Sequence, residues 1–370
     1  MFCTVMQDEE LCKELLSMIL KNKIGKIIRL FKQKPIENLA KKNGGGIYVK
    51  KGEVNLTNTT VGGEQYYDET DADKTKGNKA EAGGGIYGVH ENDTVRGVIK
   101  ISGGEVSGNT ATSSDVYAGG GIYSKYKLTV SDSAEIKNNK APNGKGGGIA
   151  IPFGGTFEFT GGTVSGNTAD GAGGGIYGMK MNGNEGEIII KGSSIIKRNT
   201  ANVSNSPAGG GIYASHKLTV EGSARIENNK APNGDGGGIV CTNNAQVDFT
   251  GGTITGNTAT RYGKGVYISP LSSGAFNMSG GAKADTNNDV YLDASGSDSA
   301  KITVNSWLTP AGGTAACITV PDANYQTTTQ VLTGSAVGSE YSKFTVTPQD
   351  SGGGNVQNWK VDSSGNLQTQ

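Results

Sequence analysis

Residues 119–149 read GGGIYSKYKLTVSDSAEIKNNKAPNGKGGGI, and residues 209–239 repeat this stretch as GGGIYASHKLTVEGSARIENNKAPNGDGGGI. From Gly83 onward, successive Gly-Gly-Gly-Ile motifs lie 36 or 27 residues apart, and any three consecutive steps sum to 90 residues. The chain therefore contains a duplicated block of three units. The motif begins at Gly44, Gly83, Gly119, Gly146, Gly173, Gly209 and Gly236, with a weaker copy at Gly263.

A second marker lies between successive glycine motifs. It is an asparagine that follows an aliphatic residue by three positions, as Asn139 follows Ile136. Its copies are Asn109, Asn139, Asn167, Asn199, Asn229 and Asn257. Because both markers recur together, each unit has the same internal layout.

Within a unit, apolar and polar residues alternate, as in Lys217-Leu218-Thr219-Val220 and Val247-Asp248-Phe249. This period of two is typical of a strand with one buried face. A unit of about 27 residues with three short strands cannot bury its apolar face alone, so we expect the units to stack. The sequence predicts an all-β solenoid, a parallel β-helix of about eight coils.

Stacking gives each marker a structural role. Asparagines at equivalent places in successive coils can pass amide hydrogen bonds along the stack, and we expect Asn78 and Asn287 to be the outer rungs of this ladder. The triple glycine allows a positive φ and close backbone approach at a corner. The sequence thus predicts a structural asparagine ladder beside a glycine corner.

A tyrosine follows the Ile or Val of most glycine motifs. Strand alternation predicts that these rings point outward, where a row of them could stack on sugars or dock a protein. The alternative is that neighbouring rings only pack on each other along one face. The candidate binding residues are Tyr87, Tyr123, Tyr177, Tyr213 and Tyr267, in a row with Tyr48 and Tyr291.

Composition narrows the function classes. Lys+Arg and Asp+Glu both number 34, so no basic excess predicts a nucleic-acid partner. The four cysteines lack CxxC spacing, and Cys241 is expected to be a buried thiol. Asp235 in Asn233-Gly234-Asp235 is Lys145 in the duplicate, which argues against a calcium ladder. We expect no metal, no cofactor, no catalytic residue and no membrane-spanning helix.

The paired markers, Gly-Gly-Gly-Ile and (Ile/Val)-x-x-Asn, resemble the GGA-I and F-x-x-N repeats of the polymorphic outer-membrane protein family of bacterial autotransporters. The resemblance covers residues 44–292. It implies a right-handed parallel β-helix displayed at the cell surface or secreted, often for adhesion. The chain departs from that family because its start has no secretion-signal pattern and no translocator barrel is recognised after residue 300.

The ends differ from the repeat. Residues 2–38, which include DEELCKELLSMIL and QKPIEN, resemble the N-terminal stretch of PD-(D/E)XK nuclease family transposases. Spacing predicts a helix over about residues 8–21 and a strand over 24–30. We divide the chain into a helix–strand segment (1–43), the parallel β-helix (44–292) and irregular β-rich coils that cap it (293–370).

These observations favour a non-enzymatic surface or secreted scaffold that binds a protein or glycan partner through loops and the tyrosine face. One alternative is a carbohydrate-active β-helix enzyme, either a lyase or a hydrolase, with its acids in the loops 64–73 and 181–187. A second alternative is a vestigial gene fusion without a selected activity.

Overall fold

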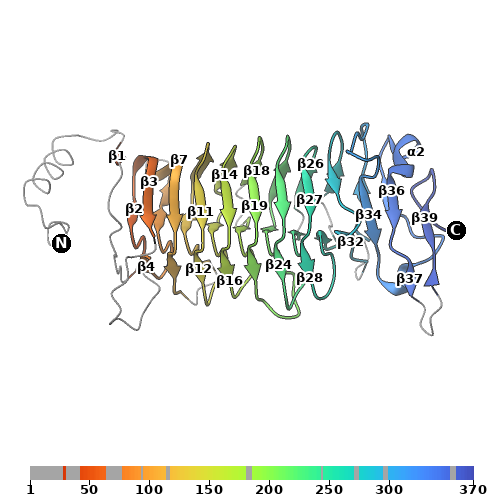
Figure 1. The fold of residues 1–370 in the computed structure, drawn as a ribbon, viewed down its shortest axis with the longest axis horizontal. Helices are drawn as coiled ribbons and strands as arrows, with labels where there is room; N and C mark the ends of the chain where they lie inside the picture. Colours follow the sequence, from red (N-terminus) through yellow and green to blue (C-terminus); the bar gives the residue numbers. More distant parts are fainter. Residues whose placement is uncertain are drawn as a thin grey trace, which may run out of the picture.

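The computed structural model describes residues 28–30, 42–63, 77–92, 95–113, 117–180, 186–242, 245–270, 275–294, 299–350 and 356–370. The fold is a parallel β-solenoid of about nine turns, close to the expected eight. Figure 1 shows a rod whose strands lie across its long axis, from β2 near one end to β39 near the other. The predicted helix over 8–21 lies outside the described residues.

The coils contribute to three sheets. The narrow sheet consists of β4 (Lys79–Ala80), β8 (Thr110–Ala111), β12 (Lys140–Ala141), β16 (Thr168–Ala169), β20 (Thr200–Ala201), β24 (Lys230–Ala231) and β28 (Thr258–Ala259). The sheet that carries the tyrosines, here the tyrosine sheet, consists of β2 (Ile47–Val49), β5 (Ile86–Gly88), β9 (Ile122–Ser124), β13 (Ile149–Ile151), β17 (Ile176–Gly178), β21 (Ile212–Ala214), β25 (Ile239–Cys241), β29 (Val266–Ile268), β32 (Val290–Leu292), β34 (Ala316–Thr319), β36 (Phe344–Val346), β39 (Trp359–Val361) and β40 (Leu367–Thr369).

The third sheet is the wide sheet, to which most coils add two strands. Its members include β1 (Ile28–Leu30), β3 (Gly52–Gly62), β7 (Val95–Ser107), β10 (Lys127–Ser131), β11 (Glu135–Lys137), β14 (Thr156–Phe159), β15 (Thr163–Ser165), β18 (Glu187–Ile190), β19 (Ile195–Lys197), β22 (Lys217–Val220), β23 (Arg225–Glu227), β26 (Gln246–Phe249), β27 (Thr253–Thr255), β30 (Ala275–Met278), β31 (Lys283–Ala284), β33 (Ile302–Thr303) and β35 (Leu332–Thr333). The short β6 (His90–Asn92) pairs antiparallel with β7.

A repeat coil therefore has four strands rather than the three that the sequence predicts. In the first two coils the wide-sheet strand is continuous, but from β10 onward it divides at a corner. Gly162, with φ +92°, occupies that corner between β14 and β15. Residues at positive φ bend the chain at this corner. The continuous strand β7 bends at the same place, since Gly103 and Gly104 both have φ +75°.

The core is a set of columns of like residues. From Ile86 onward the Ile or Val of each glycine motif is buried and lies in register with its counterpart, as Ile149 does between Ile122 and Ile176, while Ile47 at the end of the column is half-buried. On the wide sheet, Phe157 lies between Leu128 and Ile188 in the same way. Adjacent coils lie about 4.8 Å apart, so each apolar side chain is buried mainly by the coils on either side.

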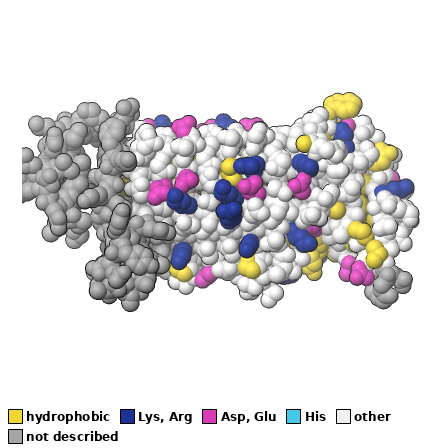
Figure 2. All heavy atoms as spheres, in the orientation of Figure 1, with side chains coloured by type: hydrophobic (Ala, Val, Ile, Leu, Met, Phe, Trp, Pro, Cys, Tyr) yellow, Lys and Arg dark blue, Asp and Glu magenta, His cyan; other side chains and the backbone are white. Residues whose placement is uncertain are grey.

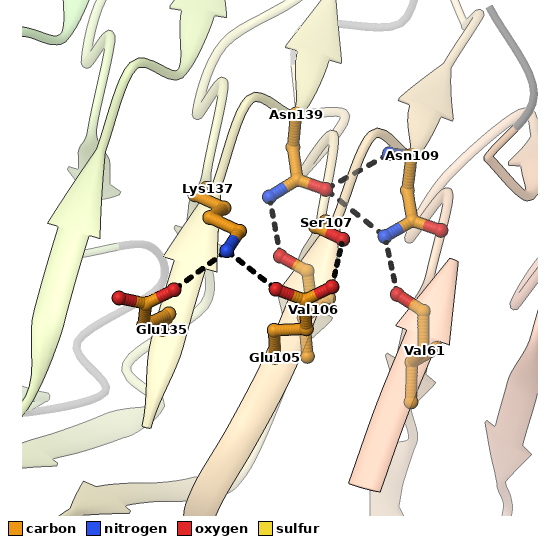
Figure 3. Close-up of polar contacts among 8 residues, drawn as sticks. All are labelled: Val61, Glu105, Val106, Ser107, Asn109, Glu135, Lys137 and Asn139. Carbon is orange, nitrogen blue, oxygen red and sulfur yellow. Dashed lines mark hydrogen bonds and ion pairs between the residues drawn. The ribbon is translucent and has the colours of Figure 1, made fainter. Parts of the chain in front are cut away.

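The predicted asparagine ladder is present, and Figure 3 shows two of its rungs. The Nδ2 of Asn109 donates to Oδ1 of Asn139 over 3.0 Å and also to the carbonyl oxygen of Val61 over 3.0 Å. The same geometry recurs along the stack, and every rung is buried. The rungs are Asn78, Asn109, Asn139, Asn167, Asn199, Asn229, Asn257 and Asn288.

The last rung corrects one prediction. Asn78 is the outer rung as expected, but the other end of the ladder is Asn288 and not Asn287. Ala284 pairs in register with Ile254 of the preceding coil. Asn257 follows Ile254 by three positions, whereas Asn288 follows Ala284 by four. The turn after β31 contains one more residue, and this moves the ladder position along the chain by one.

The glycine motif and the asparagine ladder are in contact. The first glycine has a positive φ, +76° at Gly146, which places it in the conformation that disfavours other residues. A Cβ on the third glycine, Gly148, would lie 2.7 Å from the carbonyl oxygen of Gly175 and 2.9 Å from Nδ2 of Asn167. The two markers recur together because the third glycine leaves room for a ladder amide.

Both ends of the stack extend beyond the repeat. β1 pairs in parallel with β3, which confirms the end of the strand predicted over 24–30; its earlier residues lie outside the described part. The parallel stack also continues past residue 292, from β32 to β34 and β36. β39 and β40 then close it with antiparallel pairing. The helix α2 (Val337–Glu340), which the sequence analysis did not predict, lies in this cap.

Candidate functional site

The tyrosines of the glycine motifs form one column on the tyrosine sheet. Tyr87 pairs in register with Tyr48 and Tyr123, and its ring lies parallel to both. The ring centroids are 5.5 Å and 4.7 Å apart, respectively. Two further stacked pairs follow, Tyr177–Tyr213 at 5.0 Å and Tyr267–Tyr291 at 5.7 Å. In each pair, one ring covers a face of the other.

The prediction that this row presents exposed rings is wrong for the candidate residues. Tyr87, Tyr123, Tyr177 and Tyr267 are buried, and Tyr213 is half-buried. Burial also raises the pKa of the Tyr123 and Tyr177 hydroxyls above its ordinary value. The alternative, in which the rings pack on one another, describes these five residues. Only Tyr48, at the end of the column, is largely exposed, at 49%.

The column has two gaps, and they are equivalent in the duplicated block. Ala150 occupies the tyrosine position between Tyr123 and Tyr177, and Val240 occupies it between Tyr213 and Tyr267. Both small side chains are fully buried. Other aromatic and charged side chains surround them, so the gaps are where the sheet differs most from a simple stack.

The first gap has aromatic and cationic neighbours. Tyr117 reaches the ring of Tyr177, with centroids 5.8 Å apart, and lies edge-on to Phe153 at 5.7 Å. The Nζ of Lys125 lies 5.3 Å from the Phe153 ring centroid. The Nζ of Lys145 lies 5.2 Å from that of Tyr177. Tyr117, Phe153, Lys125 and Lys145 are each half-buried, so this first-gap cluster reaches solvent.

Acidic and aromatic residues lie near the second gap, on its own coil and on the coils that follow it. Tyr262 stacks on Tyr291 with centroids 4.5 Å apart and remains 44% exposed. Asp235, which replaces Lys145 in the duplicate, accepts a hydrogen bond from the backbone N–H of Tyr262 and lies 3.6 Å from Nε of Arg261. The hydroxyl of Tyr267 donates to Asp293 over 2.7 Å. The position of Lys145 at the first gap is thus taken at the second by Asp235, which pairs with Arg261.

The wide sheet uses its charges differently. Several of its outward lysines are paired with carboxylates on neighbouring strands, as Lys100 is with Glu53 and Lys217 with Glu187, both at 2.8 Å. Lys137 lies between Glu105 and Glu135, as Figure 3 shows. In Figure 2 basic and acidic side chains are mixed over the face in view. These pairs link neighbouring coils, and on the face that Figure 2 shows the described charges of both signs are interspersed.

Other reactive groups lie inside the rod. Cys241 is buried as predicted, unpaired, and burial raises the pKa of its thiol. His216 is buried against Gly178, and its Nε2 has no hydrogen-bond partner in the described part of the chain. Burial lowers the pKa of His216 to about 4, so the ring is neutral at pH 7.

Over the described ranges, no group of three or more His, Cys, Asp or Glu residues could hold a metal ion. None of the helices in those ranges has the length and apolar character to cross a membrane. The acid-bearing loops 64–73 and 181–187 lie mostly outside the described residues; Glu187 is described and pairs with Lys217.

Sequence reasoning missed the residues that line the gaps. Tyr117, Phe153 and Tyr262 come from loops, and a period-two pattern places no loop residue. A signal was present all the same, because the motif reads GGGIA at Gly146 and GGGIV at Gly236 where other copies read GGGIY. The missing tyrosines mark both gaps.

Comparison of the chain with protein-family models, with curated proteins and with solved structures finds no match.

Proposed function

We propose that this protein is a non-enzymatic scaffold, displayed at the cell surface or secreted, that binds a glycan or protein partner at the gaps of its tyrosine sheet. The observation that carries the proposal is the presence of half-buried and exposed aromatic and charged side chains at two equivalent gaps. The fold does not require these side chains, because other coils have a tyrosine at the position that Ala150 and Val240 occupy.

The repeat supports the extracellular part of the proposal. The paired glycine and asparagine markers resemble those of polymorphic outer-membrane proteins, and such repeats are typical of rods displayed for adhesion. A solenoid also suits this task physically, because its stacked coils hold surface side chains at fixed spacing and present an extended surface. Binding then requires little ordering of the protein.

The proposal is tested with arrays of glycans and of host proteins probed with the full chain. We expect binding that falls in Tyr117→Ser or Tyr262→Ser, one residue from each gap, and persists in Tyr48→Ser. Tyr48 is the matched control, since it is an exposed tyrosine of the same sheet outside both gaps. Binding that is equal in all three variants would contradict the proposal.

The competing function is a polysaccharide lyase or hydrolase. A panel of polysaccharides incubated with the full chain separates the two functions. The scaffold is expected to bind without shortening any of them, whereas release of oligosaccharides or of unsaturated products would establish an enzyme and overturn the scaffold.

A further inference from the structure

We infer that the first-gap cluster, Tyr117, Lys125, Lys145 and Phe153, binds the carboxylate of an acidic sugar in a glycan chain. This inference rests on the proposed function and specifies one of its ligands.

Among the described residues, the two lysines of the cluster have no acidic partner. In the part of the chain that the structure describes, neither Lys125 nor Lys145 has a carboxylate within ion-pair distance, and their only partners are aromatic rings. The wide-sheet lysines Lys100, Lys191 and Lys217 all have acidic partners. Burial lowers the pKa of Lys145, in the direction expected for an ammonium group without a counter-ion.

The duplicated block shows that the fold does not demand a lysine here. Asp235 occupies the same position one block later, and its charge is compensated by Arg261 and by the N–H of Tyr262. A half-buried charge is costly unless it is paired. Asp235 has its partner among the described residues, whereas Lys145 has no acidic partner there, and a carboxylate of a bound ligand would supply one.

The neighbouring side chains favour a sugar over a peptide as that partner. The half-buried ring of Phe153 lies 5.3 Å from Nζ of Lys125, and the half-buried ring of Tyr117 packs edge-on against it. Both rings offer apolar surface to the C–H face of a sugar. A peptide cannot add to the sheet here, because β13 is already paired with β9 and β17. Recognition must come from side chains, and a uronic acid presents a carboxylate next to an apolar ring face.

The test measures binding of a hyaluronan hexasaccharide, which carries glucuronate, and of its carboxyl-reduced form, by titration calorimetry with the full chain. We expect the acidic form to bind about tenfold or more tightly than the reduced form. Lys145→Gln should remove that preference, whereas Lys145→Arg should retain it. Lys145→Asp, which reproduces the residue of the duplicate, should also abolish binding of the acidic form.

Lys140→Gln is the control variant, because Lys140 is an exposed lysine of the same coil on the narrow sheet. It should bind like the unaltered chain, and thermal unfolding should show that all variants are folded. The inference would be overturned if both forms of the hexasaccharide bind equally or if neither binds. The proposed function would still stand in that case if the chain binds another ligand on the arrays. The inference would also be overturned if inorganic sulfate or a polyglutamate peptide competes with the acidic hexasaccharide as well as the hexasaccharide itself does. Sulfate competition would indicate a general anion site, and polyglutamate competition a peptide site.

Discussion

The side-chain Nδ2 and the backbone N–H of Asn139 both donate to Oδ1 of Asn167, each over 2.9 Å. The Nδ2 of Asn167 in turn donates to the carbonyl oxygen of Ile136 and to the next rung, Asn199. Each amide inside the ladder is thereby satisfied in a fully buried site. Side-chain stacking and main-chain geometry are coupled at every coil.

Replacing a middle rung is expected to destabilise the rod strongly. Asn167→Ala leaves the Nδ2 and backbone N–H of Asn139 without their acceptor and the carbonyl of Ile136 without its donor. The free energy of unfolding should fall by about 2–5 kcal/mol, measured by urea denaturation. In Asn143→Ala, which removes one exposed hydrogen bond of 3.3 Å, the change should stay within about 0.5 kcal/mol. Similar losses in the two variants would show that the ladder adds little.

The tyrosine column is expected to act through its rings rather than its hydroxyls. Tyr177→Ser removes a buried ring that stacks on Tyr213, and should lower the free energy of unfolding by about 3–5 kcal/mol. Tyr177→Phe keeps the ring and loses only a contact of the hydroxyl with the Met179 sulfur, so its cost should be below about 1 kcal/mol. Thermal unfolding of the pair measures the difference, and a Phe variant as unstable as the Ser variant would refute this assignment.

Stability should depend on pH through His216. Its folded pKa, about 4, lies below the unfolded value of about 6.5, so the unfolded chain binds the proton more readily. The contribution of neutral His216 to the free energy of unfolding is therefore complete above about pH 6.5. This contribution, about 3 kcal/mol, is lost as the pH falls toward 4. His216→Gln should flatten the stability profile between these limits, measured by denaturation at several pH values. His90→Gln is the control, and a profile that it flattens as much would contradict the assignment to His216.

The third glycine of a motif should tolerate no side chain. Gly148→Ala places a methyl group against the Gly175 carbonyl and the Asn167 amide, and we expect a loss of about 1–3 kcal/mol. Gly281 has open space where its Cβ would lie, so Gly281→Ala should be neutral or stabilising by up to about 1 kcal/mol. Chemical denaturation compares the two variants. Equal effects would mean that the close contact at Gly148 relaxes without cost.

Repetition made the fold predictable. The asparagine ladder, the buried Ile column and the glycine corner all follow from residues that recur in register, because stacking places equal residues on each other. What failed was the exposure of Tyr123 and Tyr177, since alternation gives the side of the sheet but not the cover that neighbouring rings provide. The gap residues Lys145 and Tyr262 depend on loops whose paths no periodicity specifies.

The 90-residue duplication also makes the length of this protein adjustable. Gly119 and Gly209 begin equivalent coils, so excising residues 119–208 would join β5 to a strand that matches the one it lost. The shortened molecule would retain the C-terminal cap and lose the first gap, the one that carries Lys145. Recombination between the two blocks would thus change the length of the rod and its ligand preference in one genetic event. The new junction would pair strands that already match in sequence.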